Sequence, residues 1–186
     1  MGVETIRCDN LVIGSGPGGA TTACLLAEAG YDVVMVEEGK NLTIKSAPSY
    51  SLEEMSQKYR NSGLTPAFGK TRITYIEGRC VGGASEINAA LYHRPLPQTL
   101  KEWQLRYQID DFGPDTLTPF FEDIEKELSV STRPGGLGPA SKILGKGAKK
   151  MGWKTHEVKR FWKFEKGSKG TGGVRQSMSE TMVPRA

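Results

Sequence analysis

The sequence predicts an α/β fold that is built around a nucleotide-binding βαβ unit, and three features between Asn10 and Gly39 support this prediction. An apolar run, Leu11–Ile13, is typical of a buried strand, and glycines follow it in the spacing G-x-G-x-x-G. A second apolar run, Val33–Val36, ends beside an acidic residue, and the alanine- and leucine-rich stretch 20–29 between the two runs is helical in composition. Strand, glycines, helix, strand and acid in this order form the context in which the fingerprint indicates dinucleotide binding.

Each residue of the fingerprint has a chemical reason. Gly14 allows the tight turn out of the strand, Gly16 lets the backbone approach a pyrophosphate, and Gly19 lets the helix pack close to the sheet. The unpaired N–H groups and the dipole at the helix N-terminus favour the negative charge of the phosphates. Glu37 is placed to accept hydrogen bonds from a ribose 2′-hydroxyl and would repel a 2′-phosphate. The motif does not distinguish FAD from NAD, because both cofactors use the same cradle.

Length and composition suggest that part of a larger fold is missing. The chain has 186 residues, the size of one ordinary domain, whereas a nucleotide domain with a substrate domain needs considerably more. A hydrophobic content of 37%, a mean hydropathy of −0.42, 23 glycines and 10 prolines indicate much irregular chain. No run approaches the roughly 18 apolar residues of a membrane helix, and no signal-peptide core is present. We therefore expect no membrane span and a cytoplasmic location.

The three cysteines are widely spaced and odd in number, which suggests neither a disulfide framework nor a zinc site, so we expect no metal. Cys8, Cys24 and Cys80 are therefore interpreted as reduced thiols. Cys24 falls in the middle of the first predicted helix and is expected in the core. Cys80 lies in a second glycine loop, where it could approach a ligand.

Charge is distributed unevenly along the chain. Residues 1–139 carry 13 basic and 18 acidic side chains, whereas residues 140–186 carry 12 basic and 3 acidic ones. A basic tail can indicate nucleic-acid binding. Here it lacks regularly interleaved stacking residues and any nucleic-acid motif, so we interpret it as a solvated face or a surface complementary to missing protein, with no nucleic-acid partner.

Further elements follow the βαβ unit. Ser51 and Glu54 form a capping box for a short helix that ends near residues 61–63, and residues 71–76 are predicted to form a strand. Gly82 and Gly83 precede a predicted helical run over residues 87–91, which would offer a second helix N-terminus to a phosphate or an isoalloxazine edge. On spacing alone, a glycine turn with Ser85 as an N-cap is an equal alternative.

A second region of helices is expected after residue 98. The pair Thr99 and Glu102 predicts a helix through Tyr107, and Thr118-Pro119 predicts the start of an amphipathic helix through Leu128. A turn rich in glycine and proline over residues 134–139 leads to a helix over residues 141–151. The glycine-rich segment 167–173 is expected to be a loop.

Four segments together resemble the N-terminal part of the glucose-methanol-choline (GMC) family of FAD-dependent oxidoreductases. They are VIGSGPGG, VVMVEEG, EGRCVGGASEINAALYHR and RQSMSETMVPRA. The most specific is the third, which is close to the family's flavin-contacting pattern G-R-x-x-G-G-x-S-x-x-N over Gly78–Asn88. The resemblance implies an incomplete FAD-binding, Rossmann-like region followed by the start of an α+β substrate domain.

The resemblance also implies a set of cofactor-binding residues. The first glycine loop would hold the FAD diphosphate, Glu37 the adenosine ribose, and the second glycine loop the flavin side. The cofactor-binding residues are then Gly14, Gly16, Pro17, Gly18, Gly19, Glu37, Gly82, Gly83, Ser85 and Asn88. Some members carry the flavin covalently on a histidine before the asparagine, but this chain has Ile87 there, so non-covalent FAD is implied.

Two other features of the family have no counterpart here. Related members often have cysteines in the segment that corresponds to residues 167–173, and this chain has none there. The family's catalytic base, a histidine paired with a histidine or an asparagine, lies near the C-terminus of much longer chains. Neither His93 nor His156 matches it, and both are expected to be surface or packing residues.

The resemblance implies that the chain is an N-terminal fragment of an FAD-dependent oxidoreductase that acts on CH–OH groups of an alcohol, with hydride transfer to flavin N5. Residues 1–98 would belong to the FAD-binding domain and residues 99–186 to the start of the substrate domain. The fragment alone is expected not to turn over and to bind FAD weakly. The alternative is a stand-alone dinucleotide-binding module, or a non-catalytic remnant, with a basic tail. The alcohol, the electron acceptor and the oligomeric state stay open.

Overall fold

The computed structural model describes residues 5–170 and 172–186, which form two compact units. Unit 1 combines the chain up to Ala89 with Ser177–Ala186, and unit 2 comprises Ala90–Gln176. The sequence led us to expect the domain boundary after residue 98, with the last segment in the second region. In the structure this last segment packs with unit 1 instead. The assignment of residues 1–98 and 99–186 to cofactor and substrate domains stays a prediction.

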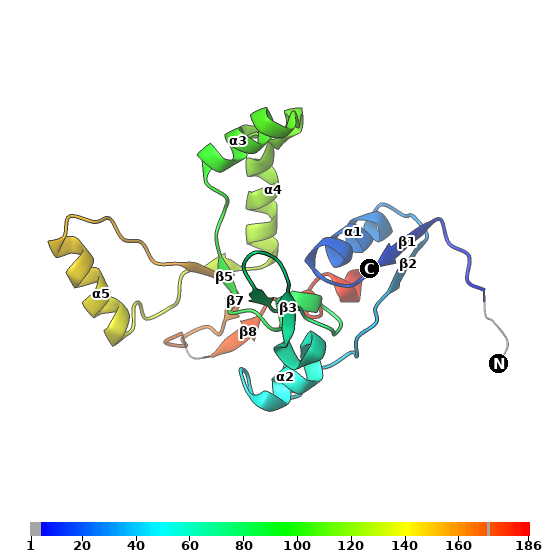
Figure 1. Ribbon diagram of the computed structural model, residues 1–186, viewed down its shortest axis with the longest axis horizontal. Helices are drawn as coiled ribbons and strands as arrows, with labels where there is room; N and C mark the ends of the chain where they lie inside the picture. Colours follow the sequence, from blue (N-terminus) through cyan, green and yellow to red (C-terminus); the bar gives the residue numbers. More distant parts are fainter. Residues whose placement is uncertain (1–4, 171) are drawn as a thin grey trace. The chain divides into compact units, whose positions relative to one another are not determined.

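Unit 1 begins with the predicted βαβ arrangement (Figure 1). Strand β1 (Asn10–Ile13) pairs in parallel with β2 (Val33–Val36), so that Asn10 lies opposite Val33 and Ile13 opposite Val36. Helix α1 (Pro17–Glu28) connects them. The prediction of both strands and of the helix between them is confirmed.

The remainder of unit 1 consists of short elements. Helix α2 (Leu52–Lys58) has Ser51 as its N-cap, and the Ser51 hydroxyl accepts a hydrogen bond from the Glu54 N–H at 3.0 Å. The Glu54 carboxylate bonds the N–H of Tyr50 at 2.6 Å, one residue before the expected partner. Strand β3 (Thr65–Ala67) then pairs with β4 (Ile73–Tyr75) in an antiparallel hairpin.

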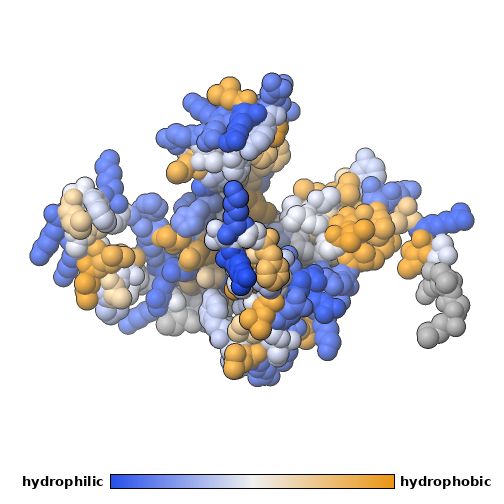
Figure 2. Space-filling view, viewed as in Figure 1, coloured by the Kyte–Doolittle hydropathy of each residue, from blue (hydrophilic) through white to orange (hydrophobic). Residues whose placement is uncertain are grey.

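The core of unit 1 is made of small side chains. Ala20, Ala23 and Cys24 on one face of α1 are fully buried, which confirms Cys24 as a core residue. The outer surface of the β1–β2 pair is apolar and open, as the orange patch over these strands in Figure 2 shows. Leu11 and Ile13 of β1 are 58% and 81% exposed. Parallel sheets are normally covered on both faces, so this two-stranded sheet is short of neighbours.

Unit 2 carries the longer helices, each of which begins with a proline. They are α3 (Pro97–Tyr107), α4 (Pro114–Glu127) and α5 (Pro139–Lys150). The expected starts at Thr99 and Thr118 are wrong, because a proline at the first helical position sets the start further upstream. The Thr118 hydroxyl instead bonds the Pro114 carbonyl at 2.8 Å inside α4. The predicted helix over residues 141–151 is confirmed.

Strand β7 (Lys159–Phe164) is the centre of the unit 2 sheet. It pairs in antiparallel fashion with β5 (Leu91–Tyr92), β6 (Val130–Ser131) and β8 (Gly173–Arg175). None of these strands was expected from the sequence. Among the described residues, no helix has the length and apolar content needed to cross a membrane.

Candidate functional site

The first glycine turn joins β1 to α1 and allows the helix to pack close to the end of the strand. Gly14 adopts a φ of +92°, and its N–H bonds the carbonyl of Val36 at 2.8 Å. A Cβ atom on Gly19 would lie 1.9 Å from the Gly14 carbonyl oxygen, so the helix reaches this distance only with glycine there. A Cβ on Gly16 would meet nothing within 4 Å. The space beside the Gly16 Cα atom is therefore open, and protein packing alone does not require glycine at this position.

The N-terminus of α1 fits an anionic ligand. Its N-cap, Gly16, provides no side-chain cap, and no acidic residue stands in the first turn. The first N–H groups of a helix have no intrahelical partners, and the helix dipole places positive charge there. The first turn of α1 thus offers donors to a diphosphate, as the fingerprint predicts. Pro17 and Gly18 lie exposed in this turn.

The carboxylate of Glu37 lies at the end of β2 and faces back toward the glycine turn. Its Oε2 accepts hydrogen bonds from the N–H of Ser15 at 2.9 Å and from the Ser15 hydroxyl at 2.7 Å, and its Oε1 accepts one from the N–H of Gly39 at 2.8 Å. Burial alone would raise the pKa of Glu37, but these donors together outweigh it and lower the pKa below the ordinary value. Glu37 is thus held as an anion with a fixed orientation.

The second glycine loop packs directly on the first. A Cβ on Gly83 would lie 2.8 Å from the Cα of Gly16, and the N–H of Gly82 bonds the Ser15 hydroxyl at 3.0 Å. The predicted helix over residues 87–91 is wrong: a single 3-10 turn, Gly83–Glu86, precedes these residues, and Leu91 already begins β5. Gly82 and Gly83 both have positive φ values, which shape a tight turn rather than a helix start.

Ser85 does not cap a helix. Its hydroxyl donates to the Gly82 carbonyl at 2.7 Å and accepts a hydrogen bond from the Met178 N–H at 2.9 Å. Asn88, the last residue of the flavin pattern, is exposed. Neither Ser85 nor Asn88 lines the cleft that is described next.

One cleft of unit 1 brings the two glycine loops and the acidic residue together. It has a volume of about 670 Å³ and is lined by Ile13, Gly14, Gly16, Val36, Glu37, Glu38, Arg60, Ile76, Glu77, Gly78, Gly83 and Ala84. Four of the predicted site residues are among these: Gly14, Gly16, Glu37 and Gly83. They come from separate parts of the sequence, so their convergence is a property of the fold. The motifs gave no indication of Arg60 or Glu77.

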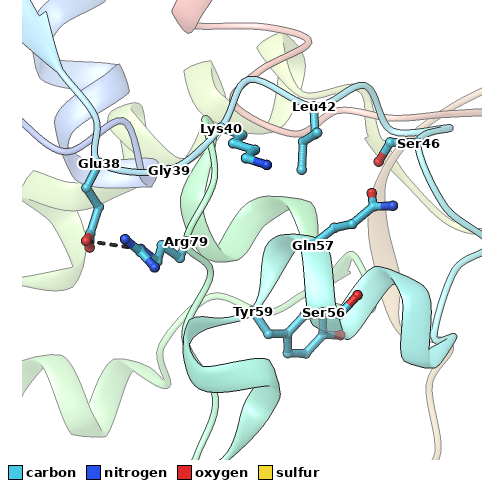
Figure 3. Close-up of a pocket in the computed structure, with 9 residues that line it drawn as sticks. All are labelled: Glu38, Gly39, Lys40, Leu42, Ser46, Ser56, Gln57, Tyr59 and Arg79. Carbon is cyan, nitrogen blue, oxygen red and sulfur yellow. Dashed lines mark hydrogen bonds and ion pairs between the residues drawn. The ribbon is translucent and has the colours of Figure 1, made fainter.

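Arg60 and Arg79 form an ion-pair network around Glu38. Arg60 contacts the carboxylates of Glu38 and Glu77, the latter at 2.7 Å, and Arg79 contacts Glu38 at 3.2 Å. The Arg60 side chain is the main cause that lowers the pKa of Glu38. Figure 3 shows Arg79 pointing toward Glu38 at the edge of a second cavity. This cavity, of about 590 Å³, is lined by Glu38, Gly39, Lys40, Leu42, Ser46, Ser56, Gln57, Tyr59 and Arg79.

Cys80 lies beneath the second glycine loop and is buried. Burial, reinforced by the charge of Glu86, raises the pKa of the Cys80 thiol to about 11. The thiol is therefore protonated near neutral pH and is a poor nucleophile.

The described residues contain no group of three or more His, Cys, Asp or Glu side chains that could hold a metal ion. His93 and His156 are exposed residues of unit 2.

Comparison with known proteins identifies the family. The GMC oxidoreductase profile matches residues 9–185. An uncharacterised GMC-type oxidoreductase, y4nJ, of Sinorhizobium fredii is 38% identical over 97% of this chain and 37% of its own length. The long-chain-alcohol oxidase FAO4A of Arabidopsis thaliana is 30% identical over 85% of this chain and 22% of its own length. The chain thus spans less than two fifths of the curated relatives it matches.

Solved structures show the same fold. An FAD-dependent oxidoreductase from Chaetomium thermophilum matches 96% of this chain, and 36% of its own, with a TM-score of 0.71 at 16% identity. The formate oxidase of Aspergillus oryzae matches 96% of this chain and 37% of its own, with a TM-score of 0.64 at 16% identity. Both likenesses extend over both units, each of which therefore corresponds to part of a larger FAD-dependent fold.

Proposed function

Since the chain belongs to the GMC oxidoreductase family and its cofactor is FAD, we propose that it forms the N-terminal, FAD-binding part of an enzyme that oxidises a CH–OH group of an alcohol. The observation that carries this proposal is the cleft in which Gly14, Gly16, Glu37 and Gly83 converge. An uncapped helix N-terminus and a fixed carboxylate at one cleft match the diphosphate and the ribose of a dinucleotide.

The residues of the chain have separate roles in this proposal. The first turn of α1 holds the diphosphate, with Gly16 open to its approach. Glu37 accepts a hydrogen bond from the adenosine ribose with the lone pair of Oε1 that Gly39 leaves available, since Ser15 occupies both lone pairs of Oε2. The second glycine loop borders the flavin side. When bound, FAD supplies the hydride acceptor, flavin N5, for the carbinol carbon of the substrate.

Ile87 stands where some family members have the histidine that binds the flavin covalently, so we propose that FAD is bound non-covalently.

The named function of the Arabidopsis relative supports an alcohol as the donor class. We assign no catalytic base to this chain, and a cytoplasmic location stays a prediction.

Titration of the chain with FAD, followed by flavin fluorescence, tests the proposal. Gly16→Val should abolish binding while the circular dichroism spectrum is unchanged, because a Cβ there meets no protein atom within 4 Å but blocks the approach to the phosphates. Glu37→Gln should weaken binding by about 1.5 to 3 kcal/mol, the value of a hydrogen bond to a charged group. Glu53→Gln, an exposed residue of α2, is the matched control and should bind like the unsubstituted chain.

Three results would contradict the proposal. They are no binding of FAD to the folded chain, a yellow Gly16→Val protein, and an unchanged dissociation constant for Glu37→Gln. Nucleic-acid binding that falls steeply between 50 and 200 mM salt, roughly the range in which phosphate contacts are lost, would instead favour the stand-alone module with a basic tail.

A further inference from the structure

Ser15 occupies a variable position of the fingerprint, between Gly14 and Gly16, and yet it is 1% exposed. The fingerprint requires no hydroxyl there, because only its glycines serve the turn, the approach and the packing. In this structure the Ser15 hydroxyl uses both its donor and its acceptor capacity. It donates to Glu37 Oε2 at 2.7 Å and accepts a hydrogen bond from the Gly82 N–H at 3.0 Å.

These two bonds join parts of the chain that are far apart in sequence. Glu37 lies 22 residues and Gly82 lies 67 residues from Ser15. Glu37 lines the cleft, and Gly82 directly precedes Gly83, which lines the same cleft. A single buried hydroxyl thus connects the phosphate loop to both.

The second backbone group of Gly82 is held in the same way. The Gly82 carbonyl accepts the Ser85 hydroxyl at 2.7 Å, and Ser85 in turn accepts the N–H of Met178 at 2.9 Å. A Cβ on Gly82 would lie 2.2 Å from a Glu86 carboxylate oxygen, and the φ of Gly82 is +90°, so both the space and the backbone conformation favour glycine there. Gly82 is therefore fixed between two serine hydroxyls, of which only Ser15 also contacts the Glu37 carboxylate.

We propose that Ser15 is a positioning residue of the FAD site, which sets the orientation of the Glu37 carboxylate and the place of the Gly82–Gly83 turn together. The inference rests on the proposed function. Replacing Ser15 by alanine removes one of two donors to Glu37 Oε2 and leaves the buried Gly82 N–H without its acceptor. Unsatisfied buried groups are costly, so the turn should move or open to water.

The charge of Glu37 provides a readout that simple destabilisation would not change. Hydrogen bonds from Ser15 and Gly39 favour the ionised form, whereas burial and the neighbouring Glu38 oppose it. Arg60 and Glu77 are the other ionisable residues that line the same cleft. Without the Ser15 hydroxyl the pKa of Glu37 should rise, so that more of the carboxylate is protonated in mildly acidic solution.

The experiment compares the 186-residue chain with its Ser15→Ala, Ser85→Ala and Ser56→Ala variants. Ser56 is exposed on α2 and bonds only the Glu53 carbonyl among the contacts described, so it is the matched control. NMR measures hydrogen exchange at the Gly82 amide and the titration of the Glu37 carboxyl carbon. FAD titrations at pH 5 and pH 8 measure the cofactor affinity.

For Ser15→Ala we expect about tenfold faster exchange at the Gly82 amide and about tenfold weaker FAD binding at pH 8, the effect of one hydrogen bond of about 1.4 kcal/mol. The loss should be larger at pH 5 than at pH 8, because the variant holds a larger protonated fraction of Glu37 in acid than the unsubstituted chain does. Ser85→Ala should loosen the turn but leave the titration of Glu37 unchanged. Ser56→Ala should match the unsubstituted chain throughout.

Two failures are distinguishable. If the unsubstituted chain binds FAD and Ser15→Ala binds it equally well at both pH values, the positioning role is overturned while the proposed function stands. The positioning role is also overturned if Ser15→Ala and Ser85→Ala change the Glu37 titration equally. If the folded, unsubstituted chain binds no FAD, the proposed function itself is overturned.

Discussion

The two units of the chain secure their structures by different means. In unit 1, backbones approach each other so closely that Gly19, Gly39 and Gly78 have no room for a Cβ, and buried hydroxyls and carboxylates fill the remaining polar contacts. In unit 2, helices and a small antiparallel sheet pack through side chains, of which Leu100 is 2% exposed and Leu128 8%.

The difference shows where geometric accuracy is needed. A dinucleotide is recognised by backbone N–H groups and one carboxylate, so the chain around the cleft must be fixed at the level of its backbone. Unit 2 has close backbone contacts of its own, since a Cβ on Gly173 would lie 2.4 Å from the Lys163 carbonyl oxygen, but its α5 leaves Ile143 and Leu144 more than 70% exposed. Where α5 lies, Figure 2 shows orange, apolar groups beside blue, hydrophilic ones. We therefore expect that adding a single methyl group at Gly19 of unit 1 destabilises the fold, whereas removing most of an exposed side chain from α5 of unit 2 does not.

The largest expected effect comes from Gly19→Ala. The new Cβ would lie 1.9 Å from the Gly14 carbonyl oxygen, which is backbone and cannot rotate away. Helix α1 would have to move off β1, so the loss should exceed the roughly 1 to 3 kcal/mol of ordinary overpacking. Urea unfolding followed by circular dichroism measures it.

Gly18→Ala is the matched control for this substitution. A Cβ on Gly18 meets nothing within 4 Å, and alanine is the better helix former, so the free energy of unfolding should rise by about 0.5 to 1 kcal/mol. Opposite signs at adjacent glycines would support close backbone contact as the organising feature of unit 1. Equal effects at the two positions would contradict it.

A second pair of identical substitutions compares core and surface within unit 2. Leu100→Ala, at a position 2% exposed, should lower the free energy of unfolding by about 2 to 5 kcal/mol. Leu144→Ala, at a position 73% exposed on α5, should change it by less than about 0.5 kcal/mol. Urea titrations of both variants provide the measurement. A large loss for Leu144→Ala would show that the apolar face of α5 is covered in solution.

The contrast between the units also explains which parts of the fold could be predicted from the sequence. The β1–α1–β2 unit was predicted because its signals are local: apolar runs, glycine spacing and an alanine-rich helix within thirty residues. The start of α3 was missed because the capping box Thr99–Glu102 was preferred to Pro97, and the start of α4 because Pro119, which lies inside the helix, was taken as its first residue. Pro97 and Pro114 each occupy the first turn of their helix, as Pro17 and Pro139 do in α1 and α5.

The features that the sequence did not predict depend on contacts that are distant along the chain. Strand β5 has two residues, and its partner β7 begins 67 positions later, so neither shows a local pattern that predicts pairing. The last segment returns to unit 1 through bonds of long sequence separation, among them the bond from Met178 to Ser85, 93 residues away. The role of Ser15 is similarly invisible in the motif, which marks the glycines on either side of it.

The smallest expected effect concerns the one strongly shifted carboxyl of unit 2 among the described residues. The hydrogen bond from Arg94 to Glu125, at 2.5 Å, lowers the pKa of Glu125 to about 2 against a burial effect, with further contributions from Tyr92 and Lys159. The pKa in the folded state lies below the ordinary value of 4.5, so the ion pair stabilises the fold above about pH 4.5. This contribution disappears as the pH falls toward 2.

Glu125→Gln should therefore lower the free energy of unfolding by about 1 kcal/mol or less at pH 7, since the Arg94 side chain is 34% exposed. The difference from the unsubstituted chain should shrink below pH 4.5 and be small near pH 2, where Glu125 is half protonated in the folded state and protonated in the unfolded state. Glu122→Gln, an exposed position of the same helix, is the control. Urea unfolding at several pH values between 2 and 7 measures the effect. A deficit that persists at pH 2 would mean that Glu125 acts through packing, and unit 2 would then resemble unit 1 in depending on shape more than on charge.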